Sequence, residues 1–138
     1  MQDFSESQDD LARLFFRAKA AAYASPMTIK GWQEAGRSDV VLVDVRKAVP
    51  PPPTRIPGSI WIPENEIAQR AGELPKDKLL VLYCWDTWCS LATSAAVVLI
   101  DLGYRVKELY GGVAAWKALR LPEVETGTER SASIQCAC

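Results

Sequence analysis

The chain has 138 residues, a nearly balanced charge of 16 Lys and Arg against 17 Asp and Glu, and no histidine. The length and the 49% apolar content are those of one ordinary globular domain. A net charge of −1 argues against a protein that grips nucleic acid through a basic face. Without histidine there are no Ser-His or Cys-His nucleophile pairs, so acid–base chemistry would have to use other groups or the substrate itself.

The apolar runs and the cysteines indicate the compartment. The first ten residues, MQDFSESQDD, are acidic and polar, unlike a signal peptide, and the apolar runs are too short to span a bilayer. We therefore expect a cytoplasmic protein without membrane contact. In that thiol-reducing setting, reactive or metal-binding cysteines are more typical than structural disulfides, and this is how we interpret cysteines 84, 89, 136 and 138.

The N-terminal half of the chain alternates helical and β-rich patterns. Apolar side chains at helical spacing predict a helix over residues 8–23, which we expect to pack onto the main domain, with packing on a partner subunit as the alternative. A shorter helix is expected over 28–35. The β-branched run VVLVDV, residues 40–45, predicts a strand buried on both faces. The next expected elements are a stiff proline loop at 49–57, a short strand at 60–62 and a helix at 64–71.

The C-terminal half continues this alternation. Its expected elements are strands at 79–84 and 106–110 and helices at 90–102 and 113–120. Strands that alternate with helices predict an α/β fold with a parallel sheet covered on both faces. The expected organisation is an accessory helix (1–25), a domain (26–122) and a flexible tail (123–138) that ends in Cys-Ala-Cys.

The segment LLVLYCWDTWCSLA places Cys84 where a buried strand turns into a helix. Ligands of open parallel sheets bind beyond the carboxyl ends of the strands. A short loop that leads into a helix N-terminus directs several backbone N–H groups at one point, and the helix dipole adds positive potential. A cysteine at the base of such a cup would be stabilised as a thiolate. The alternative is a buried cysteine that only packs.

Four stretches, in this order and spacing, resemble a single rhodanese-homology domain. They are LVDVR (42–46), RIPGSIWIP (55–63), LYCWDTWCSLA (82–92) and LYGGVAAWK (109–117). The resemblance implies a three-layer α/β fold with a central, mostly parallel sheet flanked by helices, here extended by the accessory helix. It also implies sulfur transfer through a cysteine persulfide. Cys84 occupies the nucleophile position, and the implied amide cradle consists of Trp85, Asp86, Thr87, Trp88, Cys89 and Ser90.

The resemblance also assigns supporting residues. Asp44 is implied to be structural, holding loops by hydrogen bonds. Arg46 and Arg55 lie near the same sheet edge and could lend positive charge to the site, although a surface ion pair is their expected role. Gly111-Gly112 predicts a tight strand-to-helix turn, and Trp116 is expected in the core.

The loop departs from the family pattern in charge. Many rhodanese loops hold an arginine at the sixth position, where this chain has Cys89, and Asp86 adds a negative charge. A carboxylate disfavours a neighbouring thiolate or anion. We therefore expect this site to accept sulfur poorly from thiosulfate. A thiol persulfide or a partner protein is the expected donor instead. The missing arginine also argues against a cysteine phosphatase. Trp85 and Trp88 cannot both turn inward if the amides do, so one is expected to be exposed, with packing of both on neighbouring loops as the alternative.

The roles of the other cysteines stay open. Cys89 is a candidate resolving thiol that would attack a persulfide on Cys84, with a passive small residue and a second sulfur carrier as alternatives. A six-residue loop brings the two together only if their Cα atoms lie within about 6.8 Å. Cys136 and Cys138 could relay sulfur, reduce a Cys84–Cys89 bridge, bind a soft metal or have no role. A four-cysteine zinc site is disfavoured because the pairs are separated by four residues and by one.

The sequence thus predicts a sulfurtransferase that moves sulfane sulfur from a donor to a thiol-type acceptor through Cys84, in two covalent steps and without metal or organic cofactor. The partners would be a small-molecule donor, a thiol acceptor and, for delivery, another protein. The alternatives are a thiol-disulfide or arsenate-type reductase that uses Cys84, Cys89 and the tail cysteines, and a non-catalytic binding module. The oligomeric state is left open.

Overall fold

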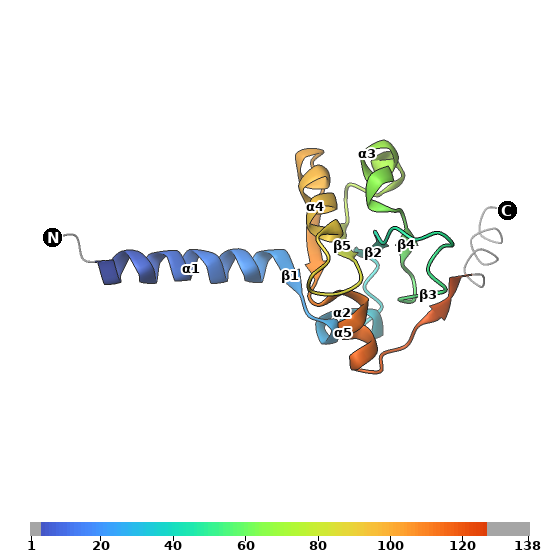
Figure 1. The fold of residues 1–138 in the computed structure, drawn as a ribbon, viewed down its shortest axis with the longest axis horizontal. Coiled ribbons are helices and arrows are strands. Elements are labelled where there is room, and N and C mark those ends of the chain that lie inside the picture. The colour runs from blue at the N-terminus through green and yellow to red at the C-terminus, as the bar shows by residue number, and fades with distance from the viewer. Residues whose placement is uncertain (1–3, 127–138) are drawn as a thin grey trace.

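A five-stranded parallel sheet forms the centre of the computed structural model, which describes residues 4–126, with side chains from residue 7 onward (Figure 1). The strand order is β1-β6-β5-β2-β4, and each neighbouring pair is parallel. The strands are β1 (Tyr23–Ala24), β2 (Val40–Asp44), β4 (Ile60–Trp61), β5 (Leu79–Tyr83) and β6 (Arg105–Leu109). The predicted α/β fold with a parallel sheet is confirmed.

The described residues form five α-helices. They are α1 (Phe4–Ala22), α2 (Pro26–Glu34), α3 (Ile67–Arg70) between the 3₁₀ turns η1 (Glu64–Glu66) and η2 (Ala71–Glu73), α4 (Leu91–Asp101) and α5 (Gly112–Ala118). All of them except α1 cover the two faces of this sheet. Apolar side chains of α3 and α4 pack on one face and those of α2 and α5 on the other. Every residue of the central strand β5 is buried, because successive side chains point to opposite faces and both faces are covered. Trp116 is fully buried, as predicted.

A small second sheet lies outside the main one. Strand β3 (Thr54–Arg55) pairs antiparallel with β7 (Val124–Glu125). The backbone N–H of Thr126 donates to the carbonyl of Pro53 at 3.0 Å. The first residues of the expected flexible tail are therefore held against the proline loop. Two-residue strands carry no periodic pattern, so this pairing was not predictable from the sequence. Cys136 and Cys138 lie outside the described residues.

Helix α1 differs most from expectation. We predicted that it packs onto the domain, and this is wrong: α1 extends away from the sheet, and Leu11, Leu14 and Phe15 are about 60% exposed (Figure 1). Only its C-terminal end meets the domain, where Lys107 Nζ donates to the last carbonyls of the helix. Because α1 runs directly into the edge strand β1, its axis is set by the sheet. An amphipathic pattern indicates that a face is to be buried, but not against which surface.

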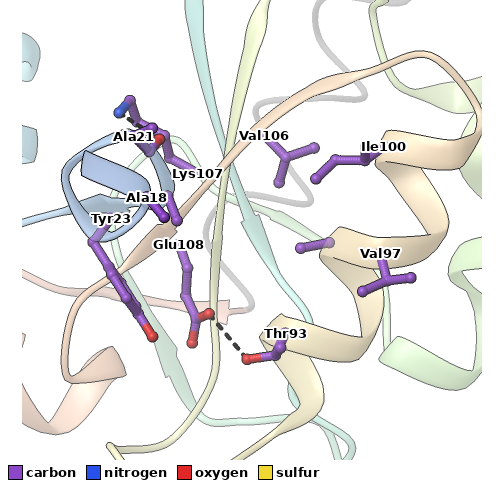
Figure 2. A pocket seen from close by; sticks show the side chains of 11 residues that line it. Ala18, Ala21, Tyr23, Thr93, Val97, Ile100, Val106, Lys107 and Glu108 are labelled. Atoms are coloured by element: carbon purple, nitrogen blue, oxygen red, sulfur yellow. Dashed lines mark hydrogen bonds between the residues drawn. The ribbon is translucent and has the colours of Figure 1, made fainter. Parts of the chain in front are cut away.

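The C-terminal end of α1, strand β6 and helix α4 enclose an apolar groove (Figure 2). None of the helices in the described part of the chain is long and apolar enough to cross a membrane.

Candidate active site

Cys84 follows the last residue of β5, and its backbone is fixed by the start of α5. The carbonyl of Cys84 accepts a hydrogen bond from the Val113 N–H at 2.9 Å, and the carbonyl of Trp85 accepts one from Ala114 at 2.8 Å. This contact requires glycine at 112, since an added Cβ would lie 2.7 Å from the Cys84 carbonyl oxygen. The φ angles of Gly111 (+79°) and Gly112 (+60°) confirm the predicted tight turn.

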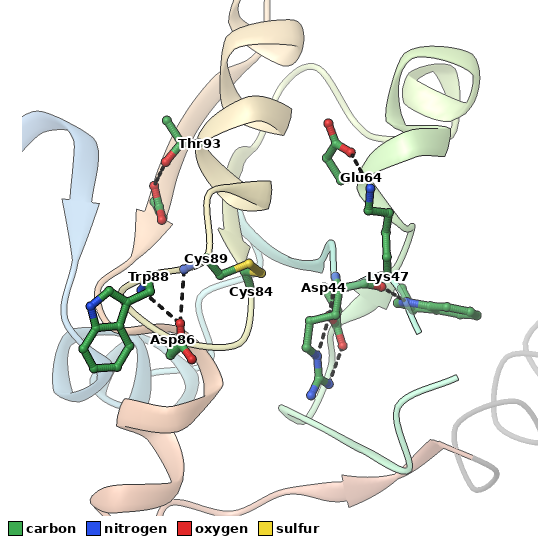
Figure 3. The surroundings of a disulfide bond; sticks show 11 residues. Asp44, Lys47, Glu64, Cys84, Asp86, Trp88, Cys89 and Thr93 are labelled. Atoms are coloured by element: carbon green, nitrogen blue, oxygen red, sulfur yellow. Dashed lines mark hydrogen bonds and ion pairs between the residues drawn. A yellow bond between two sulfur atoms is a disulfide. The ribbon is translucent and has the colours of Figure 1, made fainter. Parts of the chain in front are cut away.

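Cys84 and Cys89 form a disulfide across the six-residue loop, with their Cα atoms 6.3 Å apart (Figure 3). Cys84 is only 2% exposed and joins the apolar cluster under α4, while the half-buried Cys89 packs against the same cluster. The sequence left open whether this loop could bring the two sulfurs together, and the structure shows that it does. In this oxidised form the Cys84 sulfur is covered on the loop side by its partner.

The carboxylate of Asp86 occupies part of the expected amide cradle. Its Oδ1 accepts hydrogen bonds from the backbone N–H groups of Trp88 at 2.9 Å and Cys89 at 3.1 Å (Figure 3). The sequence analysis placed the backbone of Asp86 in the cradle but treated its side chain only as a nearby charge, and so missed this turn. The signal was available, because an aspartate commonly accepts from backbone N–H groups two and three residues further along the chain. In the disulfide form, the loop therefore holds an anion of its own on two of its amides.

The two tryptophans of the loop lie in different surroundings. Trp88 is 90% exposed, as expected for one of the pair, whereas Trp85 is 39% exposed. The guanidinium of Arg46 lies 4.8 Å from the centroid of the Trp85 ring, a cation–π contact. Thr87 and Ser90 are exposed, and Ser90 precedes the first residue of α4.

Arg46 is not the surface ion-pair residue that the sequence predicted. It is 1% exposed and bonds the fully buried Asp44 in a bidentate pair, with contacts of 2.9 and 2.6 Å. Its Nη2 also donates to the carbonyl of Thr54 at 2.8 Å. The correction has a physical reason: the proline loop and β3 cover this sheet edge, and a charge enclosed there requires a hydrogen-bonded partner. Arg55, on β3, is likewise buried, at 8% exposed.

Tyr83, the residue before Cys84, joins the same buried network. Its hydroxyl donates to Asp44 Oδ2 at 3.2 Å and accepts from the Ile56 N–H at 3.2 Å, and it lies 3.0 Å from Ser59 Oγ. Burial and the Asp44 carboxylate hold the pKa of Tyr83 far above its ordinary value. Tyr83 therefore stays a protonated donor, and its hydroxyl links Asp44 at the end of β2 to the loop after β3.

Within the described residues, no group of three or more His, Cys, Asp or Glu side chains is arranged to hold a metal ion. The candidate site thus consists of a cysteine pair, a carboxylate on the loop amides, two tryptophans and a buried ion pair beneath them. The structure brings together Cys84, Asp86 and Cys89, and it places Asp44 and Arg46 behind them, on the side of Trp85.

Comparison with known proteins agrees with this architecture. The chain matches the rhodanese-like domain over residues 27–119. Over 90 residues it is 40% identical to an HTH-type transcriptional regulator of Mycobacterium tuberculosis, a match that covers 65% of this chain and 39% of the regulator. Over 91 residues it is 36% identical to a sulfurtransferase of Allochromatium vinosum, covering 65% of this chain and 83% of that protein.

Among solved structures, the full-length protein from Lactobacillus plantarum superposes with a TM-score of 0.79 at 28% identity, covering 86% of this chain and 98% of that one. The sequence match, the fold and the position of Cys84 at the end of the central strand agree with one another. The chain belongs to the rhodanese-like family.

Proposed function

We propose that this protein is a sulfurtransferase that carries sulfane sulfur as a persulfide on Cys84. The observation that supports this most directly is the position of Cys84: it ends the central parallel strand, and its loop is clamped on the start of α5. Open parallel sheets bind ligands beyond the carboxyl ends of their strands, which is where Cys84 lies. Membership of the rhodanese-like family and the 36% identity to a sulfurtransferase support the same assignment.

The proposed reaction has two covalent steps. The thiolate of Cys84 attacks the outer sulfur of a persulfide donor, RS–SH, so that a new sulfur–sulfur bond forms and RS⁻ leaves. The enzyme then carries Cys84–S–SH. A thiolate acceptor attacks the outer sulfur, takes it as its own persulfide and releases the Cys84 thiolate.

The first step requires the reduced protein, because in the disulfide form Cys84 has no thiolate and is almost fully buried. A thiol reductant therefore has to open the bridge, which fits the proposed cytoplasmic setting. In the loaded form we propose that the persulfide is held by the amides of residues 85–90. The N–H groups of Trp88 and Cys89 would then exchange the Asp86 carboxylate for sulfur.

The charges of the loop favour a persulfide or a partner protein over thiosulfate as donor. Asp86 brings a carboxylate to the loop amides, and the sixth loop position is Cys89 instead of arginine. Thiosulfate carries two negative charges, which this carboxylate repels. The 90% exposed Trp88 offers an anchor for a protein that delivers or receives sulfur, since tryptophan is enriched at the centres of protein interfaces.

The disulfide favours a second candidate function, a persulfide reductase. In that reaction the Cys89 thiolate attacks the inner sulfur of Cys84–S–SH, the Cys84–Cys89 disulfide forms and hydrogen sulfide leaves. Two external thiols then reduce the bridge and become a disulfide themselves. The bridge with Cα atoms 6.3 Å apart is the geometry that this step requires. Whether Cys136 and Cys138 supply those thiols lies outside the described residues.

Intact-mass spectrometry of the reduced protein tests both candidates. After brief exposure to cysteine persulfide and removal of the donor, a sulfurtransferase gains about 32 Da on the peptide of Cys84 and keeps it until a thiol acceptor is added. Cys84→Ser should gain nothing there. A reductase instead releases hydrogen sulfide and ends with the bridge, and only its Cys89→Ser variant keeps the added sulfur. A protein in which Cys84 never gains sulfur would contradict both.

A further inference from the structure

The two cysteines of the Cys84–Cys89 bridge are unequally accessible. Cys84 is 2% exposed and belongs to the same buried apolar cluster as Val45 and Ala92. Its backbone is fixed on α5, where its carbonyl accepts from the Val113 N–H at 2.9 Å. Cys89 is only partly buried. A thiol that comes from solvent therefore meets Cys89 first, and thiol–disulfide exchange depends on which sulfur can be reached.

The residues beside Cys89 leave this approach open. Trp88 is 90% exposed, and its ring points away from the two sulfur atoms (Figure 3). Ser90, which follows Cys89 in the chain, is also exposed. The loop thus presents the Cys89 half of the bridge to solvent and keeps the Cys84 half covered.

A single carboxylate lies beside this approach. Oδ1 of Asp86 accepts from the Cys89 N–H at 3.1 Å, and within the described residues its hydrogen bonds come only from neutral backbone amides. The Arg46 guanidinium is 1% exposed and is paired with Asp44, so it does not offset this charge. An incoming thiol that carries a carboxylate is therefore repelled, whereas one that carries an ammonium group is attracted.

We propose that reducing thiols open the bridge by attack on Cys89, that Cys84 is the leaving group, and that Asp86 selects cationic thiols over anionic ones. In the first step a thiolate RS⁻ attacks the Cys89 sulfur. A bond between R–S and Cys89 forms, the bond between the two cysteines breaks, and its electron pair stays on Cys84. A second thiolate then attacks the sulfur of R, forms RS–SR and releases the Cys89 thiolate. Two thiols are thereby oxidised, and their protons pass to Cys84 and Cys89.

This order of events suits the proposed function, on which it rests insofar as Cys84 is the sulfur carrier. Cys84 is freed in the first step, while Cys89 still carries the reductant. The freed thiolate stays beside Cys89, two residues before the first residue of α4, where the helix dipole favours negative charge. Cys89 thus takes the exchange with external thiols, and the buried Cys84 is left for the sulfur donor.

The position of the mixed disulfide tests where the bridge opens. The oxidised chain carries Cys136→Ser and Cys138→Ser, so that the added thiol is the only reductant. It is treated with cysteamine, quenched in acid early in the reaction and digested, and fragment ions that separate positions 84 and 89 locate the adduct. We expect about tenfold more cysteamine on Cys89 than on Cys84. An excess on Cys84, an equal split, or reduction without any adduct on Cys89 would overturn the proposal.

Two small thiols of opposite charge test the selection by Asp86. Rate constants for bridge opening are measured with cysteamine and with thioglycolate, each expressed per thiolate. Asp86→Asn keeps an acceptor for the loop amides but removes the charge, so we expect the cysteamine-to-thioglycolate ratio to fall about tenfold. Asp101→Asn, on the exposed end of α4, is the charge-matched control and should leave the ratio unchanged. A ratio that Asp86→Asn does not change would contradict the selection.

The proposed function is measured separately from the opening of the bridge. Sulfur loading of Cys84 is followed on the reduced protein with a persulfide donor, whereas bridge opening is followed on the oxidised protein without a donor. Circular dichroism confirms that each variant is folded. A protein that opens at Cys89 but never loads sulfur would refute only the proposed function, and one that loads sulfur but opens at Cys84 would refute only the role of Cys89.

Discussion

The substitution Asp86→Asn tests how the loop selects its donor. The asparagine carbonyl oxygen can still accept from the N–H groups of Trp88 and Cys89, so the turn is retained while its negative charge is removed. The carboxylate contacts the Cys89 N–H at 3.1 Å, and the Cα atoms of Cys84 and Cys89 are 6.3 Å apart. A donor bound at Cys84 therefore lies well within a Debye length of this charge.

Two unit charges at such a separation, near a protein surface, interact by about 1–2 kcal/mol. Each 1.36 kcal/mol corresponds to a tenfold change in rate. We therefore expect Asp86→Asn to raise kcat/KM for thiosulfate about 5- to 30-fold relative to kcat/KM for cysteine persulfide. The assay is steady-state sulfur transfer to a thiol acceptor with each donor, and Asp101→Asn on the exposed end of α4 is a charge-matched control. An unchanged ratio of the two kcat/KM values would refute the electrostatic argument.

Three further predictions concern stability. Gly112→Ala should destabilise the fold by about 2 kcal/mol or more in urea denaturation and slow sulfur loading, because a Cβ there meets the loop backbone at a positive φ. Arg46→Ala should cost about 3–5 kcal/mol by leaving a buried carboxylate alone, whereas Arg37→Ala, from an exposed pair, should cost less than about 1 kcal/mol. Burial raises the pKa of Glu108 despite its hydrogen bond from Thr93. The contribution of Glu108 to stability is fully present below the ordinary glutamate pKa and is lost as pH rises through the higher pKa of Glu108 in the folded protein. Glu108→Gln should therefore be more stable than the parent protein at pH 7 and equally stable near pH 4.

The order of the longer strands and helices was predictable because each of them carries a local pattern, whereas the two-residue strands β1, β3 and β7 carry none. The buried run LLVLY, residues 79–83, and the glycine pair at the start of α5 are examples of such patterns. The surroundings of Arg46 were not predictable, since they depend on β3 and the proline loop folding over the sheet edge. The direction of α1 was also not predictable, because an amphipathic pattern shows that a helix has an apolar face but not which surface buries that face. Within the site, the position of Cys84 followed from the sequence, whereas the disulfide depended on the curvature of the loop.

The charge on the site follows from how the cations around it are paired. Arg46 lies over the Trp85 ring, and its charge is balanced by Asp44 in a bidentate buried pair. The carboxylate of Asp86 accepts only from neutral backbone amides within the loop. A thiolate or persulfide on Cys84 would therefore add negative charge beside an existing one, and the dipoles of the loop and of α4 would oppose it. Under these conditions we propose that a donor delivered on a protein that docks at Trp88 is favoured over a free dianion, because contact area would offset the repulsion.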